Sequence, residues 1–301
     1  MISPFFQFVL ASVLSSLFLA AILPYLRQKL IDNPNERSSH VKPTPRGGGI
    51  VFVIVGTALH LLFTSGVSAW IPIVCLPLAI VGLLDDYYDL PAKYRYAFQI
   101  LTALAILLLI NVTLPLWLFP FAVIALTALI NFMNFMDGMD GLLAGCAVLL
   151  MVATSQWALA GAIFGFLLWN WSPAKVFMGD VGSTFIGSIF VGFALQAGSF
   201  GSSTTIFLMA FPLYADAFFC VIRRYIAGQN IFTAHKYHLY QRLNQAGWKH
   251  NQVAGLYIAS ILLLITSNHL GGWHLLVPAI IAEFLLAIYI DSKIAIRFQN
   301  R

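Results

Sequence analysis

The charged residues of this chain are confined to a few clusters that long apolar stretches separate. Hydrophobic residues make up 60% of the 301 residues, whereas charged residues make up only 9%. In lipid the backbone must satisfy its own hydrogen bonds, so such a chain is limited to helices or a closed barrel. The apolar stretches are too long and too uniform for barrel strands of about 10 residues with a polar inner face. The sequence therefore predicts an all-α, polytopic integral membrane protein.

Apolar segments long enough to approach a membrane crossing recur along the whole chain. A crossing helix needs roughly 20 residues. The candidate spans are 4–26, 48–63, 70–84, 96–110, 116–130, 142–153, 157–171, 183–197, 205–222, 253–266 and 275–290. Because several are short, we expect about 10–11 transmembrane helices, with helix ends placed to within a few residues.

The connections between these segments alternate in charge. One set, 64–69, 111–115, 154–156, 198–204 and 267–274, contains no Lys, Arg, Asp or Glu. The other set holds all 16 Lys and Arg residues, at 27–47, 85–95, 131–141, 172–182, 223–251 and the tail from 291. Positively charged loops stay in the cytoplasm, which predicts an N-terminus outside and a cytoplasmic C-terminus. We expect one membrane-embedded domain, 1–301, with its active site in these five internal loops.

Other features of the composition are explained by membrane insertion. The net charge of +5 would suggest nucleic acid in a soluble protein, but here it follows from loop topology, and we expect no nucleic-acid partner. Cys75, Cys146 and Cys220 each lie in an apolar segment and are expected to be core residues. No Lys or Arg precedes the first apolar run, which favours a retained helix over a cleaved signal peptide. Glu283 is left deep in a span and is a functional candidate.

The first two charged loops carry groups that suit phosphate chemistry. In the first loop, prolines hold the chain extended, glycines 47–49 allow close backbone approach, and Arg46 is available to phosphate oxygens. The alternative is a basic loop that serves topology alone. Asp85, Asp86 and Asp89 then form a carboxylate cluster, which requires a nearby cation. Such a cluster binds a divalent metal, handles a proton, or neutralises the neighbouring Lys93 and Arg95.

The third and fourth loops add oxygen ligands and an anion site. Asn131, Asn134 and Asp137 are spaced three apart, so a helix would keep them near one face. Amide and carboxylate oxygens suit Mg²⁺; the alternative is polar contact between helices. The fourth loop places Phe177 and Asp180 before a Gly-Ser that opens a helix, where the helix N-terminus favours anions and the aromatic ring can stack on a base.

The last loop combines two histidines with several cations. His235, His238 and Arg242 follow Arg223 and Arg224. This set suggests a second contact to phosphate or sugar. A zinc pair at the i, i+3 histidines stays open as an alternative, although no cysteine in the loop supports it.

Five motifs, in order, resemble one family. They are Asp-x-Pro-x-x-Arg-Ser-x-His with Pro-Thr-Pro-Arg-Gly-Gly, Asp-Asp-x-x-Asp, Asn-x-x-Asn-x-x-Asp-Gly-x-Asp-Gly, Lys-x-Phe-x-Gly-Asp-x-Gly-Ser, and His-x-x-His-Leu-Tyr-x-Arg-Leu. Together they resemble the polyprenyl-phosphate N-acetylhexosamine-1-phosphate transferases of glycosyltransferase family 4. The resemblance covers most of the chain. It implies transfer of HexNAc-1-phosphate from a UDP-HexNAc to polyprenyl phosphate, with release of UMP.

The resemblance also implies roles for individual residues. Mg²⁺, or Mn²⁺ in its place, would be held by Asp180 with Asn134. Asp85, Asp86 and Asp180 would be catalytic. Lys93 and Arg95 would bind the lipid phosphate. The nucleotide-sugar would be bound by Arg46, Asp137, Asp140, Phe177, His235, His238 and Arg242.

Several alternatives remain within and beyond this resemblance. The split histidines differ from the adjacent histidines of the phospho-MurNAc-pentapeptide transferases, which favours UDP-GlcNAc, or a 6-deoxy sugar such as UDP-FucNAc or UDP-QuiNAc. The resemblance implies a multi-pass protein of the inner membrane, a cytoplasmic active site, O-antigen or cell-wall polymer synthesis, and a homodimer. A transporter for a lipid-linked sugar and a scaffold that only binds polyprenyl phosphate are the other classes of function.

Overall fold

The chain folds into a bundle of helices with one very short β-hairpin. The computed structural model describes residues 2–34, 42–230, 233 and 235–298. The helices are α1 Pro4–Lys29, α2 Ile50–Phe63, α3 Val67–Tyr88, α4 Ala92–Ile110, α5 Phe119–Phe135, α6 Leu142–Ala153, α7 Trp157–Asn170, α8 Gly179–Leu195, α9 Phe200–Met209, α10 Phe211–Ile226, α11 Leu239–Gln245, α12 His250–Gly271 and α13 Trp273–Lys293. The hairpin pairs β1, Ile31–Asp32, with β2, Thr44–Pro45, in antiparallel register.

The helix lengths and their composition fit a polytopic membrane protein. Among the described residues, α1, α3, α4, α12 and α13 are each long and apolar enough to cross a membrane. The bent pair α9 and α10 raises this number from five to as many as six. The shorter α2, α5, α6, α7 and α8 are also apolar. The predicted all-α membrane fold is therefore confirmed, and every predicted span corresponds to a helix or to a helix pair.

One predicted span is wrong as a continuous helix. The segment 205–222 is broken between α9 and α10, which meet at an angle of 77°. Pro212 lies in the first turn of α10, where its missing N–H costs nothing, but its ring cannot continue a helix that arrives from α9. The short helix α11 was also not expected inside the loop 223–251.

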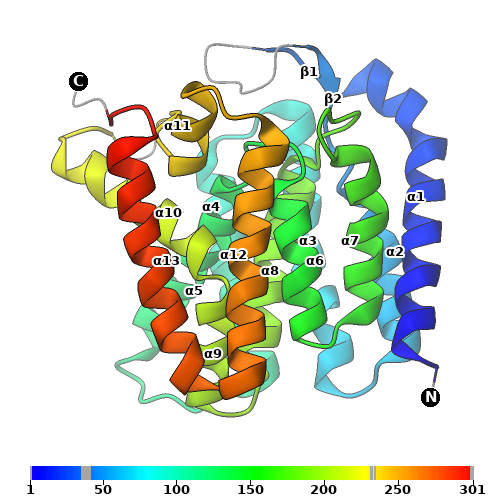
Figure 1. Cartoon of the computed structure of the whole chain (residues 1–301). Helices are drawn as coiled ribbons and strands as arrows, with labels where there is room; N and C mark the ends of the chain where they lie inside the picture. Colours follow the sequence, from blue (N-terminus) through cyan, green and yellow to red (C-terminus); the bar gives the residue numbers. More distant parts are fainter. Residues whose placement is uncertain (1, 35–41, 231–232, 234, 299–301) are drawn as a thin grey trace.

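The charged loops gather at one end of the bundle. Figure 1 shows the β-hairpin, α11 and the end of α13 at the same end, and the start of α1 at the opposite end. The first helix therefore starts and the last helix ends at opposite ends of the bundle, as an odd number of crossings requires. Which end faces the cytoplasm stays a prediction.

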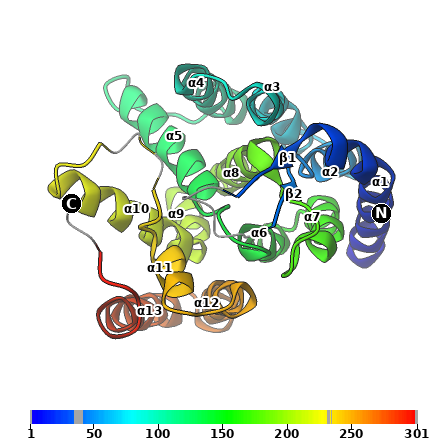
Figure 2. The ribbon, with the colours of Figure 1, turned by 90° about the horizontal axis from the view of Figure 1, so that it is seen from above.

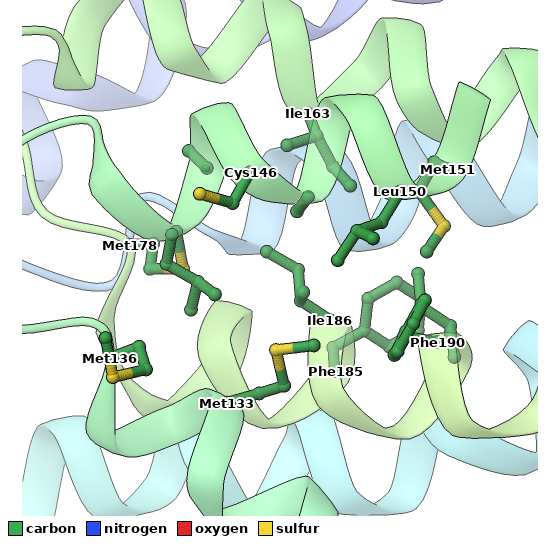
Figure 3. Close-up of a cluster of buried hydrophobic side chains, with 14 of the residues drawn as sticks. Met133, Met136, Cys146, Leu150, Met151, Ile163, Met178, Phe185, Ile186 and Phe190 are labelled. Atoms are coloured by element: carbon green, nitrogen blue, oxygen red, sulfur yellow. The ribbon is translucent and has the colours of Figure 1, made fainter. Parts of the chain in front are cut away.

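Helix α8 is the centre of the fold. Viewed from above it is surrounded by other helices (Figure 2), and every residue from Val181 to Ala194 is buried. A helix that is apolar on all sides requires this position. Figure 3 shows its side chains Phe185, Ile186 and Phe190 meeting Met133 of α5 and Met151 of α6. The first turn of α8 therefore carries Asp180 on the most enclosed element of the protein.

Glycines bring neighbouring backbones close to α8 at the charged end. A Cβ on Gly82 of α3 would lie 2.5 Å from the Asp180 carbonyl oxygen, and one on Gly49 would lie 2.5 Å from the Gly182 Cα. Small residues of this kind permit close packing of membrane helices. These contacts place the end of α3 and the start of α2 directly against the first turn of α8.

Replacing Gly82 with alanine is expected to destabilise the protein, since the new methyl group meets backbone that cannot move independently. Overpacking of this kind costs about 1–3 kcal/mol. The matched control is Gly255→Ala in α12, where a Cβ would meet open space and the change should be neutral or stabilising by about 0.5–1 kcal/mol. Thermal unfolding of both variants in detergent checks the difference. Equal melting temperatures would contradict the close α3–α8 contact.

Candidate active site

A cavity of about 610 Å³ lies at the charged end of the bundle. Its walls include Asp89 of the predicted carboxylate cluster and nine of the thirteen predicted site residues. These nine are Arg46, Asp85, Asp86, Arg95, Asn134, Asp137, Asp140, Phe177 and Asp180. The structure thus brings together the first four charged loops. The segment 35–41, which contains Arg37 and His40 of the first motif, lies outside the described residues.

Arg95 joins two of the predicted catalytic carboxylates. Its Nη1 donates to Asp85 Oδ2 at 2.9 Å and to Asp180 Oδ2 at 2.7 Å. Asp85 Oδ1 also accepts the Leu90 N–H at 2.7 Å. One guanidinium therefore neutralises carboxylates from α3 and α8 at the same point. About a third of the Arg95 side chain is exposed, so this cation also faces the cavity.

Asp86 holds the first turn of α8. Its two oxygens accept the backbone N–H groups of Asp180 at 3.0 Å and Val181 at 3.2 Å. The carboxylate therefore caps a helix that starts elsewhere in the chain, where a negative charge is favourable. Gly179 has a φ of 73°, and a Cβ there would lie 2.3 Å from Asp86 Oδ2. Only glycine fits both requirements. The structure gives Asp86 a positioning role, and its catalytic role stays a prediction.

Substitution of Asp86 can separate these two roles. Asp86→Ala removes the cap and is expected to cost about 0.5–2 kcal/mol and to lower activity because Asp180 moves. Asp86→Asn keeps one acceptor oxygen, so it should restore part of the stability and part of the activity together. Melting temperature and turnover, measured on both variants, check this. A stable Asp86→Asn variant without turnover would instead indicate direct contact with substrate.

The loop 131–141 contributes an amide and two carboxylates to the cavity. Asn134 Oδ1 accepts the Ser183 hydroxyl of α8, which fixes its amide oxygen near Asp180. Asn131 does not belong to this group. It forms a reciprocal amide pair with Gln99 of α4, so for Asn131 the alternative interpretation of polar contact between helices holds. Asn134 combines such a contact, to Ser183, with a place on the cavity wall.

The two aspartates of this loop have different environments. Burial raises the pKa of Asp137 well above its ordinary value, and the neighbouring charges of Asp180 and Asp86 raise it further. Burial would also raise the pKa of Asp140, but bonds from His250 and from the Ala174 N–H hold it below its ordinary value. The His250 ring lies 3.1 Å from Asp140 Oδ2. Asp140 is therefore an ionised anchor, whereas Asp137 retains a proton more readily.

Backbone hydrogen bonds join the end of the first loop to residues 177–178, just before α8. Phe177 N–H donates to Pro45 O at 2.8 Å, and Gly48 and Gly49 donate to the carbonyls of Phe177 and Met178, each at 2.9 Å. These bonds place Arg46 and Phe177 on the same wall of the cavity. Arg46 also donates to the exposed Asp89 at 3.2 Å. The glycines that the sequence predicted for close approach serve this backbone contact.

Four predicted binding residues lie outside the cavity wall. Lys93 is exposed and lies over the Tyr94 ring. Arg242 is buried, and it donates to Asp291 and to the carbonyls of Tyr237 and Ile296, which ties the last loop to the C-terminal segment. His235 and His238 lie beside Cys220 of α10. Their predicted roles toward a nucleotide-sugar stay predictions.

Two residues that sequence reasoning missed organise the last loop. Asp216 of α10 accepts the backbone N–H groups of Leu239 and Tyr240 and the Tyr257 hydroxyl. The sequence does contain a signal for Asp216, because it is the single carboxylate inside the predicted span 205–222. His250, at the start of α12, faces Asp140 and lines the cavity. Nothing in its local sequence pattern points to that contact.

The oxygen ligands of the cavity fit a divalent metal. Asp180, Asn134 and Asp137 offer carboxylate and amide oxygens to one space, and such oxygens suit Mg²⁺ better than softer metals. Arg95 already lies between Asp85 and Asp180, which shows that a positive charge is accommodated there. Mg²⁺ commonly uses one or two carboxylates and takes its other ligands from substrate phosphates and water. The residues present therefore fit this metal.

The fold and the cavity define a polytopic membrane protein with a carboxylate-lined site at one end, and sequence comparisons identify its family. The family model for glycosyl transferase family 4 matches residues 68–198, which contain three of the five motifs. The chain is 31% identical over 240 residues to the undecaprenyl-phosphate alpha-N-acetylglucosaminyl 1-phosphate transferase of Thermotoga maritima, covering 75% of this chain and 79% of the relative. This chain therefore belongs to glycosyl transferase family 4.

Two further relatives cover more of the chain. A probable undecaprenyl-phosphate N-acetylglucosaminyl 1-phosphate transferase of Bacillus subtilis is 28% identical over 302 residues, covering 87% of this chain and 84% of the relative. A phospho-N-acetylmuramoyl-pentapeptide-transferase of Synechococcus is 29% identical over 312 residues, covering 87% and 91%. The predicted resemblance is confirmed, and the protein is a membrane-bound transferase.

Proposed function

We propose that this protein transfers a HexNAc-1-phosphate from a UDP-HexNAc to a polyprenyl phosphate, giving polyprenyl-diphosphate-HexNAc and UMP. The observation that carries the proposal is the Arg95 bridge between Asp85 and Asp180, in a cavity at one end of a membrane bundle. A lipid phosphate and a soluble nucleotide-sugar can meet at such a place. The names of the relatives from Thermotoga maritima and Bacillus subtilis support the same reaction.

The chain's own residues supply positioning and charge. Asp180 and Asn134 would hold Mg²⁺, which supplies neutralisation of the diphosphate when bound. Arg46 and Arg95 face the cavity and bind phosphate oxygens. Phosphoryl transfer needs mainly positioning and electrostatic stabilisation, and the enclosed first turn of α8 gives Asp180 a fixed place. Phe177, on the same wall of the cavity as Arg46, offers a ring for stacking on uracil.

We favour direct transfer in one step. An oxygen of the polyprenyl phosphate attacks the β-phosphorus of the UDP-sugar, the bond from that phosphorus to the bridging oxygen breaks, and UMP leaves. Asp85 orients the acceptor or accepts its proton. The rival is a double displacement through a phospho-aspartyl enzyme. A phosphorylated aspartate trapped with the donor alone would contradict the direct scheme.

Among donors, the relatives from Thermotoga maritima and Bacillus subtilis favour UDP-GlcNAc. The spacing of His235 and His238 also favours 6-deoxy donors such as UDP-FucNAc and UDP-QuiNAc. The Synechococcus relative makes UDP-MurNAc-pentapeptide the alternative donor. We propose that the protein lies in the inner membrane with this cavity on the cytoplasmic side. Its reaction would be the first step in the synthesis of a cell-surface polysaccharide. A homodimer remains part of the same proposal.

A donor screen tests the proposal. Purified protein in detergent receives polyprenyl phosphate, Mg²⁺ and one UDP-sugar at a time, with UMP release as the readout. UMP from one UDP-HexNAc, lost on addition of EDTA and regained with excess Mg²⁺, is the expected result. Mn²⁺ in place of Mg²⁺ tests the choice of metal. A folded protein that binds the lipid but releases no UMP from any donor would favour the scaffold or the transporter.

A further inference from the structure

A second group of metal-binding side chains lies outside the carboxylate cavity. Cys220 of α10 and the rings of His235 and His238 offer one sulfur and two nitrogens that all lie within 4.8 Å of one another. Cys220 Sγ is 3.9 Å from His235 Nδ1. In a tetrahedral zinc site, bond lengths of about 2.3 Å to sulfur and 2.0–2.1 Å to nitrogen place these atoms about 3.6 Å apart. The observed spacing is close to that of a zinc site. The Tyr237 N–H donates to the same His235 nitrogen at 3.3 Å, and zinc bound there would replace this hydrogen bond.

Burial and a neighbouring carboxylate also suit a metal at this group. Cys220 is 4% exposed and His238 is 3% exposed. Asp216 Oδ1 lies 3.4 Å from His238 Nδ1, so Nδ1 faces the carboxylate and Nε2 is the ring nitrogen left for a metal. A carboxylate beside the imidazole is the usual companion of a metal-bound histidine, because it orients the ring and increases its basicity.

The chemistry of the three ligands differs from that of the carboxylate cavity. Sulfur and imidazole ligands select zinc and similar metals, whereas carboxylate and amide oxygens select Mg²⁺. Cys220 also lines a second cavity of about 330 Å³, between α10, α12 and α13. Three protein ligands leave the fourth zinc position for water or another oxygen.

We propose that Cys220, His235 and His238 bind a zinc ion that fastens the last loop to the end of α10. The fastened loop leads into α11, where Tyr240 donates its hydroxyl to Phe135 O at 3.0 Å. The His238 ring packs against both Phe135 and Tyr240. The zinc site therefore stabilises the loop that borders the Asn134 and Asp137 side of the carboxylate cavity. Its role is structural, and it is separate from the Mg²⁺ chemistry.

Metal content tests this proposal without any assay of activity. The full chain is purified in detergent, stripped with a chelator, incubated with Zn²⁺, desalted and analysed by mass spectrometry for bound metal. The wild type should retain one zinc per chain, and Cys220→Ser, His235→Ala and His238→Ala should fall to background. The matched controls are the buried cysteine variants Cys75→Ser and Cys146→Ser, and the exposed histidine variant His274→Ala, which should retain zinc.

Cobalt substitution of the wild type decides the outcome even where a variant fails to fold. Co²⁺ bound to a thiolate gives a near-ultraviolet charge-transfer band, which should appear in the wild type and in both cysteine controls. Cys220 should also resist alkylation in the zinc-loaded protein and react after chelation, read from its peptide by mass spectrometry. A wild type that retains no zinc, or a Cys220→Ser variant that retains a full equivalent, would overturn the proposal. Neither result bears on UMP release, so it leaves the transferase proposal untouched.

Discussion

Asp180→Asn is expected to lower UMP release by at least about 100-fold, while the protein stays folded and still binds polyprenyl phosphate. Mutation of residues that hydrogen-bond to metal ligands lowers metal affinity or activity by about 10–100-fold. Loss of a direct ligand should therefore lower activity by at least the upper value of that range. Asparagine keeps the size of the side chain and one oxygen, but it removes the charge that Arg95 and the metal require. Turnover and lipid binding, measured on the same preparation, check this.

Asp89→Asn is the comparison for that result. Asp89 is exposed, with 86% of its side chain accessible, and pairs with Arg46. Its φ of 50° is a conformation that asparagine tolerates well. An exposed ion pair contributes roughly 0.2–1 kcal/mol, so this variant should lose less than about fivefold. Full activity of Asp180→Asn would remove Asp180 from the mechanism, and lost lipid binding would indicate a general structural defect instead.

Arg95→Ala should have the second largest effect, a loss of about 100-fold in kcat/KM for the lipid acceptor, equal to about 2.7 kcal/mol. Without the guanidinium, the carboxylates of Asp85 and Asp180 repel each other and the acceptor phosphate. Arg95→Lys should recover only part of this loss, because lysine is shorter and its ammonium does not reach the position of Nη1, which contacts both carboxylates. Steady-state kinetics with varied acceptor and varied donor would separate the two substrates.

Lys93→Ala tests whether activity with the lipid acceptor requires the bridging position of Arg95 or only a positive charge at this end of α4. Lys93 is exposed on the same helix, two residues before Arg95. A solvated charge there attracts an anionic lipid only over a short, salt-dependent range. We therefore expect a modest loss that disappears at high ionic strength, whereas the defect of Arg95→Ala should persist. Equal defects in the two variants would contradict the specific bridge.

Much of the fold could be predicted because each segment has a strong and local signal. Apolar length and alternating loop charge locate the helices, and α6, Leu142–Ala153, has the predicted bounds. The break before Pro212 was missed because both halves are equally apolar, and hydropathy does not register a change of direction. Residue type likewise identified nine residues of the cavity wall, since charged and amide side chains are rare in this chain.

The contacts that the sequence did not predict depend on partners distant in sequence. Asp86 was recognised as a carboxylate, but its bonds to the first turn of α8 follow only from the crossing of α3 and α8. Arg242 was predicted to contact phosphate or sugar because cations in a loop suggest anions, and that role stays a prediction. Its bond to Asp291, which the tail brings back to the last loop, was not predicted. No local pattern distinguishes a cation that binds substrate from one that binds the chain itself.

The backbone hydrogen bonds between the first loop and residues 177–178 have a consequence for how the protein is synthesised and inserted. Gly48 and Gly49 bond to Phe177 and Met178, almost 130 residues later in the chain. At a synthesis rate of about 5–20 residues per second, the first loop waits roughly 6–26 s for its partner. During that time α1 and α2 are inserted, but the cavity wall beside Arg46, which residues 177–180 form, has not yet been synthesised. The catalytic end is therefore completed only after most helices have left the translocation machinery, and nascent chains that stop before α8 should expose this loop to protease.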